Sequence, residues 1–227
     1  MRKIFASACA AVMAAAVVVG AAHPASAVSE EQELVEKARF TADRMLKDPD
    51  FGTMTDLMKR AKGVMIIPSL LKAAFFFGAE GGSGVLLARR PGGGWSYPAF
   101  YTLGGASFGF QFGGEASEVI LLIMNDDAMK AVMKDQIKLG ADASVAVGPI
   151  GAGIEGATTT AIGADIYSFA RAKGLYAGVS LEGTVVYGRE SYNEAYYGSG
   201  ATARAILVEG ALANAGADGL RAALAPY

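Results

Sequence analysis

The sequence predicts an α+β protein in which helices at both ends of the chain flank a mostly antiparallel sheet. Apolar residues recur at helical spacing near the start of the chain and again near its end. Between these regions the chain is rich in glycine, with 30 glycines in 227 residues against an average of about 7%. Aromatic and β-branched residues that favour strands accompany them. Because glycine permits turns and strand bends, we expect a barrel-like or strongly coiled sheet with no linker between two domains.

The first predicted helix covers Glu30–Lys47, where the apolar residues follow a helical period. Ser29 and Gln32 have the spacing of a capping box, in which each side chain bonds the backbone N–H of the other residue. Acidic residues in the first turn favour the positive end of the helix dipole. The helix is expected to end at the Asp48-Pro49 pair.

The remaining elements follow from the same periodicities and from turn residues. A turn at Pro91–Gly94 separates two strand-like runs. The expected strands are Val64–Ile67 (ended by Pro68), Gly84–Arg90, Trp95–Phe112, Glu118–Met124, Ala141–Val147, Ala152–Ala161, Ala164–Ala170 and Leu175–Tyr187. The expected helices are Phe51–Ala61, Asp126–Lys138 (capped by Asn125), Ala201–Ala213 and Gly219–Leu224.

The first 27 residues have the pattern of a cleavable export signal. Arg2 and Lys3 precede an apolar run over Ile4–Gly20, and a small-x-small cleavage pattern follows at Ala25–Ala27. We therefore expect residues 1–27 to be removed and residues 28–227 to form one domain that is periplasmic or secreted. The alternatives are an uncleaved anchor and a lipoprotein at Cys9, whose distance from Lys3 is short for a signal of that kind.

The chain contains one histidine, His23, and one cysteine, Cys9, and both lie in this predicted signal. The exported part would then lack the ligands of a Cys/His zinc site, the groups of a Ser-His-Asp or Cys-His site and a disulfide. Its net charge would fall from −2 to −4, because Arg2 and Lys3 leave with the signal. Nucleic acid is not an expected partner of such a surface. The sequence predicts a non-enzymatic protein without catalytic residues, cofactor or metal.

Three short motifs match known sites but lack the context that those sites need. Gly151–Gly156 reads G-x-G-x-x-G, yet no helix start follows it as dinucleotide binding requires. Gly105–Gly109 reads G-x-S-x-G, which needs a histidine base. Ser69 and Lys72 form S-x-x-K without the partner motifs of an acyl-serine site. An enzyme that uses Ser69 and Lys72, or a carboxylate-bound metal, is the least favoured hypothesis.

The segment Leu57–Arg90 combines positive charge with apolar and aromatic residues. It carries six cations and one anion, Glu80, on a chain that is otherwise acidic. This composition favours contact with an anionic lipid surface, with cations at headgroups and aromatic side chains at the acyl boundary. The plainer reading is a buried strand with solvated ends. The candidate lipid-binding residues are Lys59, Arg60, Lys62, Lys72, Phe75, Phe76, Phe77, Arg89 and Arg90.

A longer set of motifs resembles the SYLF family, also called the Ysc84-type lipid- and actin-binding domain. The resemblance covers about residues 57–198. The motifs that carry it are Ala61-Lys62-Gly63, Lys72-Ala73, Gly81-Gly82-Ser83-Gly84-Val85 with Ala88-Arg89, Trp95-Ser96 with Pro98, Asn125, Ala146–Gly151, Tyr167-Ser168, Lys173–Gly183, and Asn193 with Tyr197-Gly198.

The resemblance implies a non-enzymatic domain that binds membranes. Eukaryotic members bind phosphoinositides and some bind actin. They typically carry an arginine after the Gly-Pro-x-Gly motif and basic residues near the Asn-x-x-Tyr-Tyr motif, where this chain has Ala152, Glu194 and Ala195. A bacterial periplasm offers neither actin nor abundant phosphoinositide. The expected partner is therefore an anionic phospholipid such as phosphatidylglycerol or cardiolipin, with peripheral attachment to the membrane.

The alternative to a lipid-binding role is a structural or assembly protein of the cell envelope. In that case the same apolar surface would form the interface of a homo-oligomer, and exposed strand edges would pair between protomers.

Overall fold

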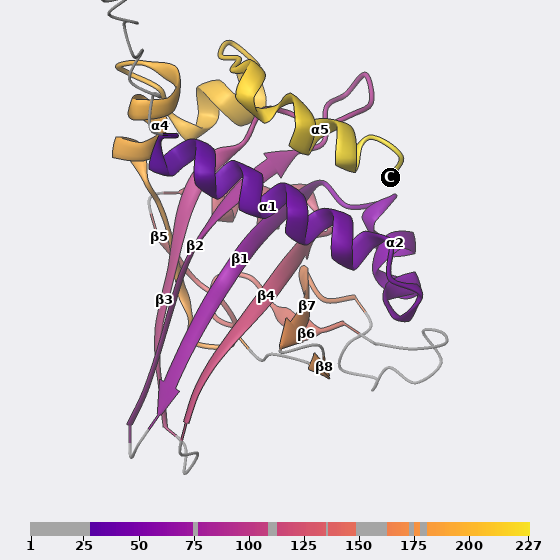
Figure 1. Ribbon diagram of the computed structural model, residues 1–227, viewed down its shortest axis with the longest axis vertical. Helices are drawn as coiled ribbons and strands as arrows, with labels where there is room; N and C mark the ends of the chain where they lie inside the picture. Colours follow the sequence, from indigo (N-terminus) through magenta and orange to yellow (C-terminus); the bar gives the residue numbers. More distant parts are fainter. Residues whose placement is uncertain are drawn as a thin grey trace, which may run out of the picture.

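The computed structural model confirms the α+β class and shows one curled, mostly antiparallel sheet of nine strands (Figure 1). It describes residues 28–74, 77–108, 113–134, 136–148, 163–172, 175–177 and 181–227. The strand order is β5-β9-β3-β2-β1-β4-β7-β6, and β8 pairs with β7. Among the described strands β6 and β7 run parallel, while the other pairs are antiparallel. Helices precede and follow the sheet in the chain, as predicted.

The helices and strands have the following bounds. The strands are β1 (Gly63–Ala74), β2 (Phe77–Ala88), β3 (Ala99–Phe108), β4 (Gly113–Ile123), β5 (Gln136–Lys138), β6 (Val145–Val147), β7 (Ile166–Ala172), β8 (Leu175–Ala177) and β9 (Val185–Gly188). The α-helices are α1 (Glu30–Leu46), α2 (Gly52–Met58), α3 (Asp126–Val132), α4 (Glu190–Tyr197) and α5 (Asp218–Leu224). Two short 3-10 helices, η1 (Pro49–Phe51) and η5 (Ala215–Ala217), and a π-helix, η4 (Ala205–Glu209), complete the set.

Strand β1 continues through Pro68, where the sequence predicted its end. The register of β1 with both of its neighbours shifts between Ile66 and Leu70, so Pro68 lies within an irregularity in the pairing. Proline has no N–H to donate, and such irregularities are where a sheet tolerates it. The strand therefore runs to Ala74, and β2, β3 and β4 are extended beside it into long hairpins (Figure 1).

Two glycines of β2 lie against this irregular part of β1. A Cβ atom on Gly82 would lie 2.7 Å from the carbonyl oxygen of Ser69, and one on Gly84 would lie 2.6 Å from that of Ile66. Both distances are shorter than a side-chain carbon can approach a backbone oxygen. The Gly-Gly-Ser-Gly motif thus permits the close approach of two backbones.

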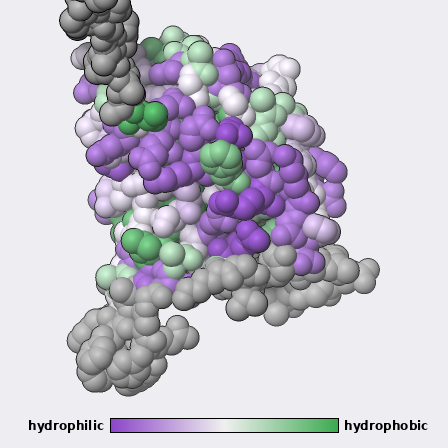
Figure 2. Space-filling model, in the orientation of Figure 1, coloured by the Kyte–Doolittle hydropathy of each residue, from purple (hydrophilic) through white to green (hydrophobic). Residues whose placement is uncertain are grey.

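The sheet separates two apolar clusters. Helix α1 lies across one face (Figure 1), where its apolar side packs on β1, β2 and β4 together with α2 and α5. The opposite, inner face is closed by α3, β5 and the π-helix η4. Figure 2 shows that the α1 side is mostly hydrophilic, with hydrophobic area below α1 over the far parts of β1 to β3, where Leu71 is 58% exposed.

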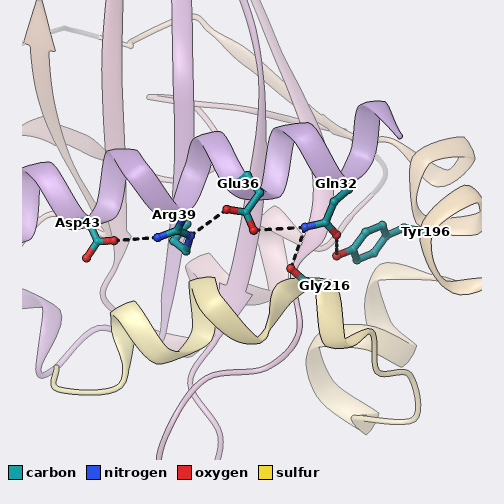
Figure 3. A network of polar contacts seen from close by, with 6 residues as sticks. All are labelled: Gln32, Glu36, Arg39, Asp43, Tyr196 and Gly216. Carbon is teal, nitrogen blue, oxygen red and sulfur yellow. Dashed lines mark hydrogen bonds and ion pairs between the residues drawn. The ribbon is translucent and has the colours of Figure 1, made fainter. Parts of the chain in front are cut away.

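A polar network fastens α1 to the C-terminal part of the chain (Figure 3). The Ser29 hydroxyl accepts from the Gln32 N–H as predicted. The Gln32 side chain, however, donates to the Gly216 carbonyl at 2.9 Å and accepts from the Tyr196 hydroxyl at 2.8 Å. Half of the expected capping box is thereby replaced by tertiary contacts. The network consists of Gln32, Glu36, Arg39, Asp43, Tyr196 and Gly216.

Several other sequence predictions need correction. The helix predicted over Asp126–Lys138 ends at Val132, and residues Gln136–Lys138 pair with β9 as strand β5. The helix predicted over Ala201–Ala213 includes the π-helix η4, and helix α4 was not predicted. The strand predicted over Leu175–Tyr187 is divided between β8 and β9. The predicted signal and the strand Ala152–Ala161 lie outside the described residues.

We predict that Gly84→Ala destabilises the fold by about 1–3 kcal/mol, because a methyl group would be forced against the backbone of β1. Urea denaturation followed by circular dichroism measures this change. Gly92→Ala is the matched control, since nothing lies within 4 Å of a Cβ atom at Gly92. Equal stability of the two variants would contradict the proposed packing.

Candidate functional site

Five of the predicted cations gather at one end of the sheet. Gly63 at the start of β1 pairs with Ala88 at the end of β2, which brings Lys62 beside Arg89. The Arg89 N–H donates to the Lys62 carbonyl at 2.8 Å, and the Lys62 N–H donates to the Ile123 carbonyl at 2.7 Å. Lys59 and Arg60 follow α2 at the same end, and Arg90 continues from Arg89.

The remaining predicted site residues lie elsewhere. Lys72 is near the other end of β1, about 30 Å from Lys62 at 3.3 Å per residue. Its ammonium group lies 2.7 Å from the Glu80 carboxylate, whose side chain is only 7% exposed. Phe75 and Phe76 are outside the described residues, and Phe77 begins β2 with its side chain outside the described part. The structure therefore divides the predicted site between the two ends of β1.

A groove opens at the basic end, with a volume of about 690 Å³. Its floor and walls combine methionine and aliphatic side chains with positive ones. Its lining residues are Lys62, Ala88, Arg89, Arg90, Pro91, Asp126, Met129, Lys130, Met133, Arg204, Leu207 and Val208. Four segments distant in the sequence build it: the start of β1, the end of β2, helix α3 and the π-helix η4. Lys130, Arg204 and the apolar residues were not predicted, because nothing in the local sequence places them beside Lys62.

Helix α3 forms one wall and is held by its N-terminal cap. The Asn125 side chain accepts from the Ala128 N–H at 2.8 Å and donates to Asp165 at 2.6 Å. Hydrogen bonds from Ser144 and Asn125 hold the pKa of Asp165 below its usual value. On the side facing β1, a Cβ atom at Gly63 would lie 2.7 Å from the Met129 sulfur. Glycine in the Lys62-Gly63 pair thus lets α3 pack closely on the sheet.

The π-helix η4 forms the opposite wall. π-Helices are rare and occur often at functional sites. Leu207 is buried under this wall, while Val208 is 54% exposed and supplies the groove with open apolar area. Arg204, just before η4, also lines the groove and lies 3.0 Å from Glu209.

The groove is positively charged, although acidic groups surround it. Five cations line it, against one carboxylate, Asp126. Lys62 lies 3.6 Å from Asp126, and Lys130 lies 2.9 Å from Asp127. Exposed ion pairs of this kind contribute little to folding stability and are screened by salt. Arg90 is exposed and has no ion pair within the described residues, so its charge is available to an anionic surface.

The segment also contains the one serine–lysine pair considered for catalysis. Lys72 pairs with Glu80, whose carboxylate also accepts from the Thr184 hydroxyl on the inner side of the sheet. Ser69 lies three residues before Lys72 on the same strand, and residues three apart on a strand point to opposite faces. The pair therefore does not have the geometry of a nucleophile and its base.

Two other features are absent from the described residues. No group of three or more His, Cys, Asp or Glu side chains within them is arranged to hold a metal ion. None of the helices in the described ranges combines the length and hydrophobicity needed to cross a bilayer.

Comparison with known proteins places the chain in a family. Residues 104–227, more than half of the chain, match the family model Ysc84, described as "Las17-binding protein actin regulator". The chain belongs to the Ysc84 family. This confirms the SYLF resemblance that the motifs indicated.

Relatives of this Ysc84-family chain come from animals and yeast. SH3 domain-containing YSC84-like protein 1 of Xenopus laevis is 34% identical over 177 residues, which cover 77% of this chain and 52% of the relative. The human protein of that name is 35% identical over 176 residues, covering 77% and 51%. LAS seventeen-binding protein 3 of Saccharomyces cerevisiae is 36% identical over 188 residues, covering 81% and 41%. The chain thus spans about half the length of these relatives.

Arg89, in one of the motifs that carry the Ysc84 resemblance, has a structural role. Its guanidinium donates to the main-chain oxygens of Ala61, Met58 and Tyr227 at 2.7, 2.6 and 3.1 Å. It also stacks on Trp95, with 4.2 Å between the guanidinium carbon and the ring centroid. Burial lowers the pKa of Arg89 from its usual value, but arginine stays charged. Arg89 thus links the residues at the end of α2 to Tyr227 and stabilises the backbone beside the groove.

Asn193, from another motif of the family, is also buried for a structural reason. Its side-chain oxygen accepts from the Phe100 N–H at 2.9 Å, and Tyr197 on the same helix donates to the Pro98 carbonyl at 2.7 Å. These two bonds attach α4 to the start of β3. The Asn-x-x-Tyr-Tyr motif therefore positions a helix against the sheet.

We predict that Arg89→Ala destabilises the protein by about 2–3 kcal/mol, because three main-chain oxygens lose a charged donor. Arg89→Lys should recover only part of this loss, since an ammonium group cannot reproduce the planar fork. Arg90→Ala is the matched control and should stay within about 0.5 kcal/mol of wild type. Chemical denaturation provides the measurement, and equal effects at the two arginines would refute the role assigned to Arg89.

Proposed function

We propose that this chain is a non-enzymatic domain that attaches peripherally to membranes containing anionic phospholipid. The observation that carries the proposal is the groove, where the exposed Val208 and two methionines lie among five cations. Interfacial binding combines these two contributions, namely burial of apolar area and attraction of cations to anionic headgroups. Each cation near such a surface contributes about 1 kcal/mol at low salt.

The charge distribution favours attachment with the groove facing the membrane over other orientations of the protein. The chain has a net charge of −2, so its surface as a whole is repelled by an anionic membrane. An acidic protein approaches such a membrane with its positive end first. Arg90, Lys62 and Lys130 surround one opening, and the opposite face of the sheet is covered by α1, whose first turn is acidic.

The proposal depends on the groove rather than on Lys72 and Phe75–Phe77. Lys72 belongs to the far end of β1 and Phe77 begins β2, while Phe75 and Phe76 lie outside the described residues. Lys72 is engaged by Glu80 and is 30% exposed, so its charge is largely compensated within the protein.

The family model is described as a Las17-binding actin regulator, and the yeast relative is named as a LAS seventeen-binding protein. For this chain the predicted export signal favours a lipid ligand, because neither actin nor abundant phosphoinositide is expected in a bacterial periplasm. Phosphatidylglycerol and cardiolipin are the ligands that we propose.

Vesicle co-sedimentation tests this function. The full exported chain should bind vesicles containing phosphatidylglycerol, bind phosphatidylcholine vesicles little, and dissociate as salt screens the charges. The double variant Lys62→Glu with Arg90→Glu should bind at least about thirty-fold more weakly, because about 1 kcal/mol is lost for each cation before the added repulsion is counted.

Lys37→Glu is the matched control, since Lys37 is 59% exposed on α1 and its ion pair, with Glu33, is an exposed one within the same helix. It changes the net charge by the same amount per substitution but lies on the helix that covers the other face of the sheet. Thermal unfolding of each variant shows whether the fold is intact. Binding that ignores salt, or that falls equally in the control, rules the proposed groove out.

The alternative is a homo-oligomer formed through the same apolar surface, for which Val208 supplies exposed hydrophobic area. The outermost strands of the sheet path, β5 and β6, are three residues long, and short edges disfavour pairing between protomers. Light scattering without lipid separates the two functions. A stable oligomer that does not bind vesicles would favour assembly over membrane attachment.

A further inference from the structure

The solvent side of helix α1 has a charge pattern that packing within the protein does not require. The helix packs on the sheet through residues such as Val35, Ala38 and Ala42, each 0% exposed. Residues on the opposite side of the helix therefore point to the solvent, and they recur at every third or fourth position. They are Glu33, Glu36, Lys37, Phe40, Asp43, Arg44 and the C-cap residue Lys47. This set is called the α1 outer face below.

Phe40 is the apolar residue of the α1 outer face and lies at its centre. Its side chain is 50% exposed, and the Arg39 guanidinium carbon lies 4.2 Å from the ring centroid. Figure 2 shows an apolar spot surrounded by hydrophilic atoms over α1. Single exposed apolar residues are common on protein surfaces, so Phe40 alone does not indicate a partner.

The charges of the α1 outer face are arranged antisymmetrically about Phe40. Three pairs of charged residues lie seven, four and three positions on either side of it, and the two members of each pair have opposite charge. From the outside inwards, these pairs are Glu33 with Lys47, Glu36 with Arg44, and Lys37 with Asp43. In a two-fold symmetric contact, residue i of each copy meets residue j of the other. A second copy of α1, antiparallel and centred on Phe40, thus brings each charge to its opposite.

The pattern selects this arrangement over a parallel one. Two parallel helices in the same register would place Glu33 against Glu33 and Lys47 against Lys47, and like charges at close range repel. The spacing of three and four residues is also the one at which a helix presents a continuous row of side chains to a second helix. Sequence spacing and charge therefore indicate the same antiparallel contact.

The outer pair of charges is accessible to a second copy. The side chains of Glu33 and Lys47 are 58% and 72% exposed. Within one copy, Glu33 lies 2.6 Å from Lys37, and Lys47 lies 2.7 Å from Asp43. Such exposed pairs within a helix contribute little, so they can be exchanged for pairs between two helices.

The middle pair has additional partners inside the protein. Arg39 donates to the Glu36 carboxylate at 2.9 Å, and Arg44 pairs with Glu118 of β4. Substitution of Glu36 or Arg44 would therefore disturb the folded chain itself. The outer pair, Glu33 and Lys47, gives the cleaner test.

We propose that two copies of this chain associate through their α1 outer faces, antiparallel and about a two-fold axis at Phe40. The two Phe40 rings meet at the axis, and each of the three ion pairs forms twice. One pair of helices is a small interface, so the dimer is weak and reversible. The candidate groove is built by α3 and η4 on the inner side of the sheet, and it stays open in the dimer. This association is therefore independent of the proposed function.

Analytical ultracentrifugation of the full exported chain over a range of protein concentrations tests the association. Wild type should show a monomer–dimer equilibrium that shifts to monomer as salt screens the charges. Glu33→Lys should weaken the dimer about fivefold or more, because two attractive contacts with Lys47 become repulsive. Lys47→Glu should weaken it by a similar factor. The double variant Glu33→Lys with Lys47→Glu should return to within about twofold of wild type, because the exchanged charges again face their opposites.

Recovery in the double variant has no explanation within a single helix. There the exchange places like charges four residues apart, against Lys37 at one end and Asp43 at the other, and such pairs weaken a helix. Thermal unfolding should accordingly show the double variant to be no more stable than either single variant. A dimer that recovers while the helix does not therefore reports a contact between copies.

Asp56→Lys is the matched control. Asp56 is 70% exposed on α2 and pairs with Lys59, so its substitution changes the charge as Glu33→Lys does but lies off the α1 outer face. It should dimerise as wild type does. Phe40→Ala should weaken the dimer several-fold with little change in thermal unfolding, because the side chain is exposed. A chain that is monomeric at all concentrations, a double variant that does not recover, or equal weakening by Asp56→Lys would overturn the proposal.

The groove variant separates this proposal from membrane attachment. Lys62→Glu with Arg90→Glu should dimerise as wild type does, whether or not the chain binds vesicles. Lys37 belongs to the α1 outer face, so the vesicle experiments with Lys37→Glu are made at protein concentrations at which the wild-type chain sediments as a monomer.

Discussion

The structure depends on the burial of the first part of β1 on both of its faces. Val64 and Ile66 pack under α1, and Met65, Ile67 and Leu70 pack on the inner side; all are 1% exposed or less. A strand buried on both faces has no tolerance for a shift of register, because each face requires its own set of side chains. β1 therefore sets the positions of β2 and β4, which pair with it on either side.

The candidate groove is a consequence of this arrangement. Because β1 begins at Gly63 between the ends of β2 and β4, Lys62 emerges at a corner where Arg90 and helix α3 also lie. Because Gly63 has no side chain, Met129 of α3 can pack closely against β1. The Arg89 guanidinium links the end of α2 to Tyr227 through hydrogen bonds. The cations of the groove are thus held by apolar packing and backbone hydrogen bonds, while their own charged ends remain at the surface.

Local sequence signals were reliable where neighbouring residues decide the structure. The start of α1 at Ser29, the cap at Asn125 and the turn after Arg90 were predicted because each depends on residues within four positions. Predictions from local sequence were wrong where a residue distant in the chain determines the structure. Pro68 ends a strand in isolation but not beside the paired glycines of β2. Residues Gln136–Lys138 were expected to continue the helix that Asn125 caps, yet they pair with β9, which lies almost fifty residues later in the chain.

The sequence by itself determined the α+β class, the family motifs and the excess of positive charge in Leu57–Arg90, because composition and short-range spacing carry that information. Only the tertiary structure decided which of those cations act together. It separated Lys62 from Lys72 by the length of β1 and brought Lys130 and Arg204 to Lys62 from distant parts of the chain. Such groupings arise from strand register and long-range packing, which no local pattern encodes.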